Sequence, residues 1–293
     1  MGHDAAKMMD DQETFVQIEP DEPSPVLVEV PHAGLWLDAE AAAWTNCPVR
    51  CLPRDADLYV HELFARAPEL GATLLYAHIS RYLVDLNRGA DDYDGQAVQG
   101  GHRAERPRGV IWRTSSDGIP VLRQRLPVDE YRRRMRRYHQ PYHDAIRRTL
   151  ERKRAQFGFA VMLCAHSMPS PRVRGRSAAS RWGAAGLADI VPGTRGRSSA
   201  DGAWIDLVEQ VSRDHGFTVQ HDVPYRGGFT TGHYGRPEEG WHAVQIEIAR
   251  RLYLDEQRLG RVPERFARVQ RYADDVVTKT VVAARHMADL AAQ

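Results

Sequence analysis

The chain has 293 residues, of which 42% are hydrophobic and 27% charged, a composition and length typical of a globular protein with a large buried core. Forty basic against 39 acidic residues leave a formal net charge of +1, which gives no global attraction to nucleic acid or to an anionic membrane. Apolar runs too short for a membrane span, an acidic N-terminus and only three cysteines predict a cytoplasmic protein without a membrane anchor or a disulfide framework.

Residues 1–24 are polar, acidic and rich in proline, which predicts a mobile leader followed by a single domain over 25–293. Runs of β-branched and apolar residues predict strands at 26–30, 72–77, 82–86, 159–165, 217–220 and 243–248. Amphipathic segments predict helices at 57–66, 128–154, 201–215 and 262–290. Strands that alternate with helices indicate a layered α/β domain around a mixed central sheet.

Arginines gather at 132–137 and 147–154, which is one way that proteins bind phosphates. Tyr131, Met135 and Tyr138 recur there at helical spacing, which places the arginines on the opposite, solvated face of a helix. We therefore expect no nucleic-acid partner. A third segment rich in Arg, Gly and Ser, residues 170–199, lacks periodicity and predicts an extended loop over a functional face.

Two histidines follow predicted strands directly. His32 comes after the strand at 26–30, and His166 comes at the end of the apolar run 159–165. Ligands of α/β sheets bind at the carboxyl ends of strands, so the two side chains are expected at one sheet edge, although either histidine alone would more often be structural. Together they predict a hydrolytic zinc site, which needs about three protein ligands and a position for water.

The third ligand is expected from the start of the predicted helix at 57–66, where Asp55 and Asp57 lie two residues apart. Aspartate at such a position is more commonly a helix cap, so one of the two caps the helix and the other binds the metal. Asp57 is preferred as the ligand, and Asp55 remains the alternative.

The segment 80–88 brackets an apolar run with Arg81 and Arg88 and contains Asp85 and Asn87. A guanidinium matches a carboxylate in geometry, and a neighbouring amide can bind either a carboxylate or an acyl oxygen. Asn87 and Arg88 are therefore candidates for binding a carboxylate of a ligand, with an internal salt bridge between Arg88 and Asp85 as the alternative. Arg81 has two interpretations, a second substrate contact or an internal salt bridge with Asp85.

Glu247 lies in the otherwise apolar predicted strand 243–248, where an unpaired charge would be costly, so a function or a buried partner is required. Beside a metal-activated water it is a suitable general base. The glycine-rich residues 225–235 predict a flexible active-site loop, or else an ordinary surface turn, and its His233 is the next candidate for the base.

These motifs, in chain order, resemble those of N-formylglutamate amidohydrolases over about residues 26–256. They are Pro-His-Ala-Gly at 31–34, Asp-x-Asp-Leu at 55–58, Ser-Arg-Tyr-Leu-Val-Asp-Leu-Asn-Arg at 80–88, Tyr-His-x-Pro-Tyr-His at 138–143, Ala-His-Ser-Met at 165–168, Gly-Gly at 227–228 and Gln-Ile-Glu-Ile at 245–248. That family is similar in fold to zinc carboxypeptidases, so the resemblance implies a three-layer α/β/α sandwich with a mixed central sheet.

The resemblance further implies zinc as cofactor with His32 and His166 as ligands, Glu247 as general base, and Asn87 with Arg88 as the carboxylate clamp. The chain also departs from the expected pattern. Carboxypeptidases carry a glutamate ligand where this chain has Leu35, so the carboxylate has to come from Asp57 or Asp55. Many relatives have Trp-His where this chain has Leu58 and Tyr59.

The predicted reaction is hydrolysis of a small acyl amide on an acidic N-acyl amino acid, with Glu247 carrying the proton from water to the leaving amine. The substrate's second carboxylate needs another arginine, either Arg81 or one from the loop around Arg195 and Arg197. Another N-acyl amino acid, a modified peptide, or a catalytically idle relative that only binds a ligand are the alternatives. The oligomeric state is left open, with a homo-oligomer as one option.

Overall fold

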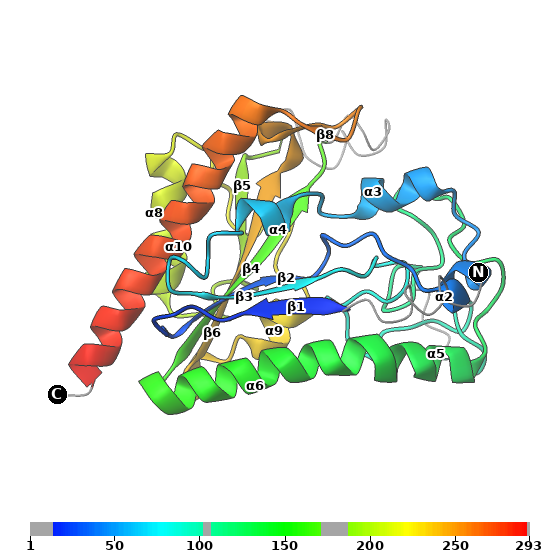
Figure 1. Cartoon of the computed structure of the whole chain (residues 1–293), viewed down its shortest axis with the longest axis horizontal. Coiled ribbons are helices and arrows are strands. Elements are labelled where there is room, and N and C mark those ends of the chain that lie inside the picture. Colours follow the sequence, from blue (N-terminus) through cyan, green and yellow to red (C-terminus); the bar gives the residue numbers. More distant parts are fainter. Residues whose placement is uncertain (1–13, 102–106, 171–186, 292–293) are drawn as a thin grey trace, which may run out of the picture. The chain divides into compact units, whose positions relative to one another are not determined.

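A six-stranded sheet organises the fold, as seen in a computed structural model that describes residues 14–101, 107–170 and 187–291 (Figure 1). The strands are β1 (Phe15–Ile18), β2 (Val26–Val30), β3 (Thr73–Ala77), β4 (Ala160–Met168), β5 (Ile190–Gly193) and β6 (Trp241–Ala249). They lie in the order β1-β3-β2-β4-β6-β5. Because β4 is parallel to both β2 and β6 whereas β5 is antiparallel to β6, the predicted α/β class with a mixed sheet is confirmed.

Helices and a small ribbon complete the described part of the chain. The α-helices are α2 (Ala39–Trp44), α3 (Leu52–Asp55), α4 (Val60–Leu63), α5 (Val128–Arg134), α6 (Gln140–Phe157), α8 (Gly202–Asp214), α9 (Phe229–Tyr234) and α10 (Pro263–Ala291). Shorter helical segments are η1 (Val49–Cys51), the π-helical η2 (Met135–His139), η4 (Pro237–Glu239) and η5 (Arg250–Leu252). The ribbon pairs β7 (Leu254–Asp255) with β8 (Gly260–Arg261).

The chain divides into two compact units, and the single domain over 25–293 remains a prediction. The first unit contains the chain up to residue 16 together with 31–56 and 76–144, and the second contains 17–30, 57–75 and the chain from 145 onward. Strand β1 lies within the predicted leader 1–24, so the ordered fold begins earlier than the composition indicates. The leader's residues 1–13 lie outside the described residues.

In the second unit, different helices cover the two faces of the sheet. Alternate residues of a strand point to opposite faces, so the contacts of the β6 side chains identify the helix on each face. Thr231 of α9 donates a hydrogen bond to Gln245 of β6, so the odd-numbered side chains of β6 face α9. His242 meets the ring of Trp204 in α8, so the even-numbered side chains face α8, and α10 lies alongside α8 (Figure 1). Every residue of β4 and β6 is buried, as expected for strands covered on both faces.

Two predicted strands are wrong, and in the first of them long-range partners bind the backbone groups. Residues 82–86 form turns, in which the N–H of Asp85 donates to the carbonyl of Val110 at 2.9 Å and Arg134 donates to the carbonyl of Leu83 at 2.9 Å. Residues 217–220 contribute a single bridge, between Val219 and Ile190. An apolar pattern does not reveal that such groups are engaged elsewhere.

The predicted helices at 201–215 and 262–290 are confirmed by α8 and α10. The helix predicted at 128–154 is continuous but contains the π-helical turn η2, and the one predicted at 57–66 is reduced to the short helix α4. Part of the predicted loop 170–199 lies outside the described residues, and 190–193 form strand β5.

Among the described residues, no helix combines the length and apolarity needed to cross a membrane. The cysteines at 47, 51 and 164 are free thiols.

Candidate active site

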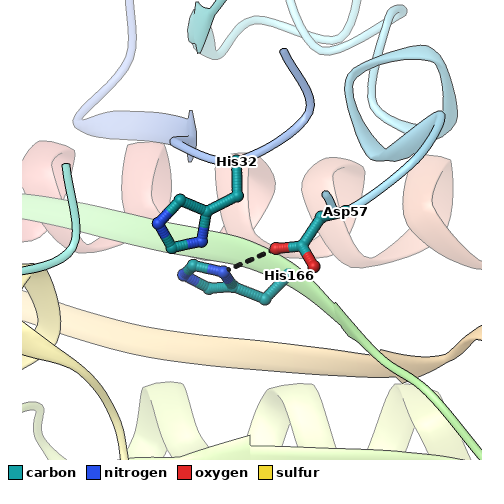
Figure 2. A group of neighbouring side chains, drawn as sticks. All are labelled: His32, Asp57 and His166. Atoms are coloured by element: carbon teal, nitrogen blue, oxygen red, sulfur yellow. Dashed lines mark hydrogen bonds and ion pairs between the residues drawn. The ribbon is translucent and has the colours of Figure 1, made fainter. Parts of the chain in front are cut away.

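His32, Asp57 and His166 lie close together in the interior and form the candidate metal centre (Figure 2). Each offers one ligand atom, and these atoms lie within 4.8 Å of one another. His32 is the second residue after β2, His166 belongs to the neighbouring parallel strand β4, and Asp57 follows helix α3. Two imidazoles and a carboxylate are a donor set that fits Zn²⁺ in a hydrolytic site.

Asp57 is held by partners on both carboxylate oxygens. Oδ2 lies 3.0 Å from Nδ1 of His166. Oδ1 accepts hydrogen bonds from Ser167 Oγ at 3.1 Å and from Arg250 Nη2 at 3.2 Å. The backbone next to Asp57 is fixed as well, because the hydroxyl of Tyr253 donates to the carbonyl of Leu58 at 3.0 Å.

His166 carries a proton at neutral pH in the metal-free chain. Burial opposes the charged ring, but the hydrogen bond to Asp57 and the negative charges of Asp57, Glu247 and Glu29 outweigh it and raise the pKa of His166 to about 9. A metal at this position would therefore take the place of a proton.

Glu247 points to the same face of the sheet as His166, because the two residues are partners in the parallel register of β4 and β6. Gln245 Nε2 donates to Glu247 Oε1 at 2.9 Å, and Gln245 Oε1 accepts from the N–H of Gly228 at 2.8 Å. The side chain of Gln245 thus connects the candidate general base to the glycine-rich loop. The sequence analysis assigned no role to Gln245.

A second buried carboxylate, Glu29 of β2, was also missed. It is fully buried, and its charge contributes to the raised pKa of His166. The rule that singled out Glu247, a carboxylate inside an apolar strand, applies equally to Glu29 and would have found it.

In the first unit, Asp85 orients His32. Nε2 of His32 donates to Asp85 Oδ1 at 2.8 Å, which leaves Nδ1 as the ring nitrogen for a metal. Asp85 also accepts from the N–H of Asn87, from Trp112 Nε1 at 2.8 Å, and from Nε and Nη2 of Arg81 at 3.2 and 2.7 Å. Burial opposes this anion, but the charges of Arg81 and His32 and the hydrogen bond from His32 hold the pKa of Asp85 well below its usual range.

The two arginines of the segment 80–88 have different environments. Arg81 forms the predicted internal salt bridge with Asp85 and also donates to the carbonyl of Asp55, and its role toward a substrate remains a prediction. Arg88 is 44% exposed, and its Nη1 lies 3.7 Å from Oδ2 of Asp92. Of the two, Arg88 has a guanidinium that is accessible to a ligand.

Two histidines hold the backbone on either side of Asn87. Nε2 of His139 donates to the carbonyl of Arg88 at 2.8 Å, and Nε2 of His143 donates to the carbonyl of Leu86 at 3.0 Å. His139 ends the π-helical turn η2, a type of distortion that often occurs at functional sites. These residues explain the motif at 138–143, to which the sequence analysis gave no role.

Asp55 has a structural environment within the first unit. Its carboxylate accepts from the hydroxyl of Tyr82 at 2.6 Å and from the N–H of Ser116 at 2.9 Å. The carboxylate in the candidate metal centre is that of Asp57.

Arg195 lies across the glycine-rich loop of the second unit and has an exposed side chain. A Cβ atom at Gly232 would lie 2.8 Å from both Cδ and Nε of Arg195, so a larger residue at that position would displace the arginine side chain. Asp222 fixes the turn by accepting from the N–H of Thr194 at 2.6 Å. The substrate role of Arg195 remains a prediction.

His233 belongs to α9, and its ring stacks on Phe229 with centroids 4.8 Å apart. Desolvation and the positive charge of Arg236 lower the pKa of His233, which favours the neutral ring. Its role toward a substrate also remains a prediction.

The fold is α/β, and a buried candidate metal centre lies toward the carboxyl ends of the parallel strands β2 and β4. A family model described as N-formylglutamate amidohydrolase matches residues 24–254. The chain belongs to this family and is an enzyme that hydrolyses amides.

Relatives of known name agree with this assignment. The chain is 34% identical over 236 residues to an N-formylglutamate deformylase of Pseudomonas aeruginosa, which covers 80% of this chain and 83% of the relative. It is 33% identical to the N-formylglutamate deformylase of Pseudomonas putida over 79% of this chain and 82% of the relative. The crystal structure of an N-formylglutamate amidohydrolase from Ralstonia eutropha JMP134 is similar, with a TM-score of 0.84, 31% identity, and coverage of 93% of this chain and 99% of that chain.

Proposed function

We propose that the chain is a zinc-dependent deformylase of N-formylglutamate or of a closely similar N-acyl acidic amino acid. The observation that carries the proposal is the buried donor set of His32, Asp57 and His166, with Glu247 on the adjacent strand, in a member of the N-formylglutamate amidohydrolase family. The proposed substrate, N-formylglutamate, is the one named for the relatives called N-formylglutamate deformylase. Zinc at these residues would lower the pKa of water and polarise the acyl carbonyl.

Glu247 is the proton carrier of the proposed reaction. It would accept a proton from the attacking water and give it to the nitrogen of the leaving amino acid, so that formate and glutamate are released. Gln245 holds Glu247 through one carboxylate oxygen, and the side chain remains on the face of the sheet to which His166 points. A base must be within hydrogen-bond reach of the proton that it removes, and this hydrogen bond limits its freedom.

Asn87 and Arg88 are the proposed clamp for a substrate carboxylate. Asp85, His139 and His143 fix the backbone around them. The exposed guanidinium of Arg88 can bind a carboxylate in bidentate fashion. Arg195 is the candidate for the second carboxylate, because its place over the glycine-rich loop leaves it exposed.

Metal analysis together with substrate kinetics tests the proposal. We expect one zinc per chain in freshly purified protein, and kcat/KM for N-formylglutamate well above the values for N-formylaspartate and N-formylnorvaline. Equal rates on all three substrates would refute recognition of the second carboxylate. Absence of amine release from all of them would favour a ligand-binding relative.

Replacing the proposed base separates chemistry from metal binding. Glu247→Gln should keep the zinc and the fold and lower kcat by about 100-fold or more, because the amide cannot accept the proton. Near-normal kcat in this variant would assign the base to another residue, with His233 as the next candidate.

A further inference from the structure

A closed ring of three hydrogen bonds lies behind the carboxylate of Asp57. Arg250 Nε donates to Ser167 Oγ at 3.0 Å, Ser167 Oγ donates to Asp57 Oδ1 at 3.1 Å, and Arg250 Nη2 donates to the same Oδ1 at 3.2 Å. All three side chains are buried, with exposed fractions of 3–5%. Two separate donors therefore converge on one oxygen of the carboxylate.

We propose that Arg250 and Ser167 are positioning residues that make Asp57 a metal ligand through Oδ2 alone. The inference rests on the proposed zinc site. Oδ1 already accepts two hydrogen bonds, whereas Oδ2 faces Nδ1 of His166 at 3.0 Å. The orientation of the carboxylate is thus set by protein groups and does not depend on the metal, as is common for residues that support metal ligands.

The shape of the arginine side chain matters as well as its charge. Nε and Nη2 lie on one edge of the planar guanidinium, and that edge spans Ser167 and Asp57 at once. A lysine ammonium would keep the positive charge but has no rigid edge to hold both partners. Arg250 begins η5 directly after β6, so the residue that supports Asp57 comes three residues after Glu247 in the chain.

Charge and orientation have opposite effects on metal affinity. A guanidinium close to the site repels a divalent cation, so loss of the charge alone would tighten metal binding. Loss of the oriented Oδ2 would weaken it. Arg250→Lys separates the two effects because it keeps the charge and removes the fork, and Ser167→Ala removes one member of the ring without any change of charge.

The test is the Kd for Zn²⁺ and Co²⁺, measured by competition with a chromophoric chelator, together with the visible spectrum of the Co²⁺-loaded chain. We expect Arg250→Lys to raise Kd about 10- to 100-fold and Ser167→Ala to raise it by a smaller factor. Both should change the Co²⁺ spectrum, because a released Oδ1 can add a ligand atom. Arg251→Lys is the matched control: Arg251 is the adjacent arginine and pairs with Asp189 at 2.7 Å, so its Kd should equal that of the wild type.

The outcomes distinguish the inference from the function on which it rests. A wild-type chain that binds neither metal overturns the proposed zinc site and this inference with it. A wild type that binds metal, with unchanged Kd and spectrum in both Arg250→Lys and Ser167→Ala, overturns the inference alone. If Arg250→Lys fails to fold, as judged by its circular dichroism, the Kd and spectrum of Ser167→Ala decide.

Discussion

Each unit of the chain contains a histidine, an aspartate and an arginine in contact, and the two sets serve different ends. In the first unit, Asp85 binds Nε2 of His32 through one oxygen and Arg81 through the other. In the second unit, Asp57 faces Nδ1 of His166 through one oxygen and binds Arg250 through the other.

The difference lies in which nitrogen of the ring the carboxylate engages. Asp85 accepts from Nε2 of His32, so in the proposed zinc site it would orient His32 to bind the metal through Nδ1. Asp57 belongs to the group whose ligand atoms lie within 4.8 Å of one another, so it is itself a candidate ligand. In the proposed zinc site, the same three residue types would therefore give a supporting carboxylate in one unit and a ligating carboxylate in the other.

Removing each aspartate should separate these roles and produce the largest effects. Asp57→Asn should weaken Zn²⁺ binding by more than the ~100-fold that loss of a supporting residue costs, and it should also destabilise the fold, because it leaves buried Arg250 without its anion. Asp85→Asn should reduce the free energy of unfolding by about 3 kcal/mol or more, because it leaves Arg81 without its buried anion, but it should weaken Zn²⁺ binding by no more than ~100-fold. Metal titration and denaturant unfolding of both metal-free variants measure this, and equal losses in both assays would remove the distinction.

Substitutions of the two arginines of the segment 80–88 should also have different effects, on catalysis for Arg88 and on stability for Arg81. Arg88→Ala should lower kcat/KM for N-formylglutamate about ten- to several-hundred-fold without loss of stability, and Arg88→Lys should recover only part of the rate. Arg81→Ala should destabilise the fold, because buried Asp85 would lose its arginine and keep only the hydrogen bonds from His32, Trp112 and the N–H of Asn87. Unfolding curves measured with the kinetics separate the two arginines. A normal rate in Arg88→Ala would exclude it from the substrate clamp.

The pH dependence of the metal-free chain tests the protonated state of His166. Its pKa of about 9 in the fold lies above the ordinary value of 6.5, so protonated His166 stabilises the fold fully below about pH 6.5, and this contribution disappears as the pH rises through 9. Between these values the free energy of unfolding should fall by up to about 1.4 kcal/mol per pH unit. Denaturant unfolding of the metal-stripped wild type and of His166→Asn from pH 6 to 10 provides the comparison, and parallel profiles would contradict the raised pKa.

The smallest expected effect concerns Trp112, which donates a hydrogen bond to Asp85 in the first unit. Trp112→Phe removes one of the donors to Asp85 but leaves the pairs with His32 and Arg81. The free energy of unfolding should fall by about 1–2 kcal/mol, with Zn²⁺ affinity changed less than about threefold. Denaturant unfolding and chelator competition measure both quantities. A larger loss of affinity would show that Trp112 also orients His32 for the metal.

Much of the sheet and several site residues could be predicted from local sequence. A carboxylate in an apolar strand, as at Glu247, and a histidine at a strand end, as at His32, are unusual enough to be noticed without a structure. The strands at 26–30 and 243–248 were found because burial on both faces leaves a continuous apolar run.

The remaining features depend on contacts between distant residues. Asp55 and Asp57 are equally suited to bind a metal in sequence, but the chain is extended at Ala56, and Asp55 then meets Ser116 while Asp57 meets His166. Arg81 and Arg88 resemble each other until their partners are known. Pairings over so many residues leave no periodic signal in the sequence.

The alternation of side chains along β6 restricts how this protein can diverge. Gln245 and Glu247 face α9, and the residues between and beside them face α8. Deletion or insertion of one residue early in the strand would exchange the two faces, bury the carboxylate on the wrong side and bring isoleucine into the active site. Single substitutions on β6 are therefore compatible with the fold, whereas insertions and deletions within the strand are not. Changes of chain length have to accumulate in the segments that connect the strands.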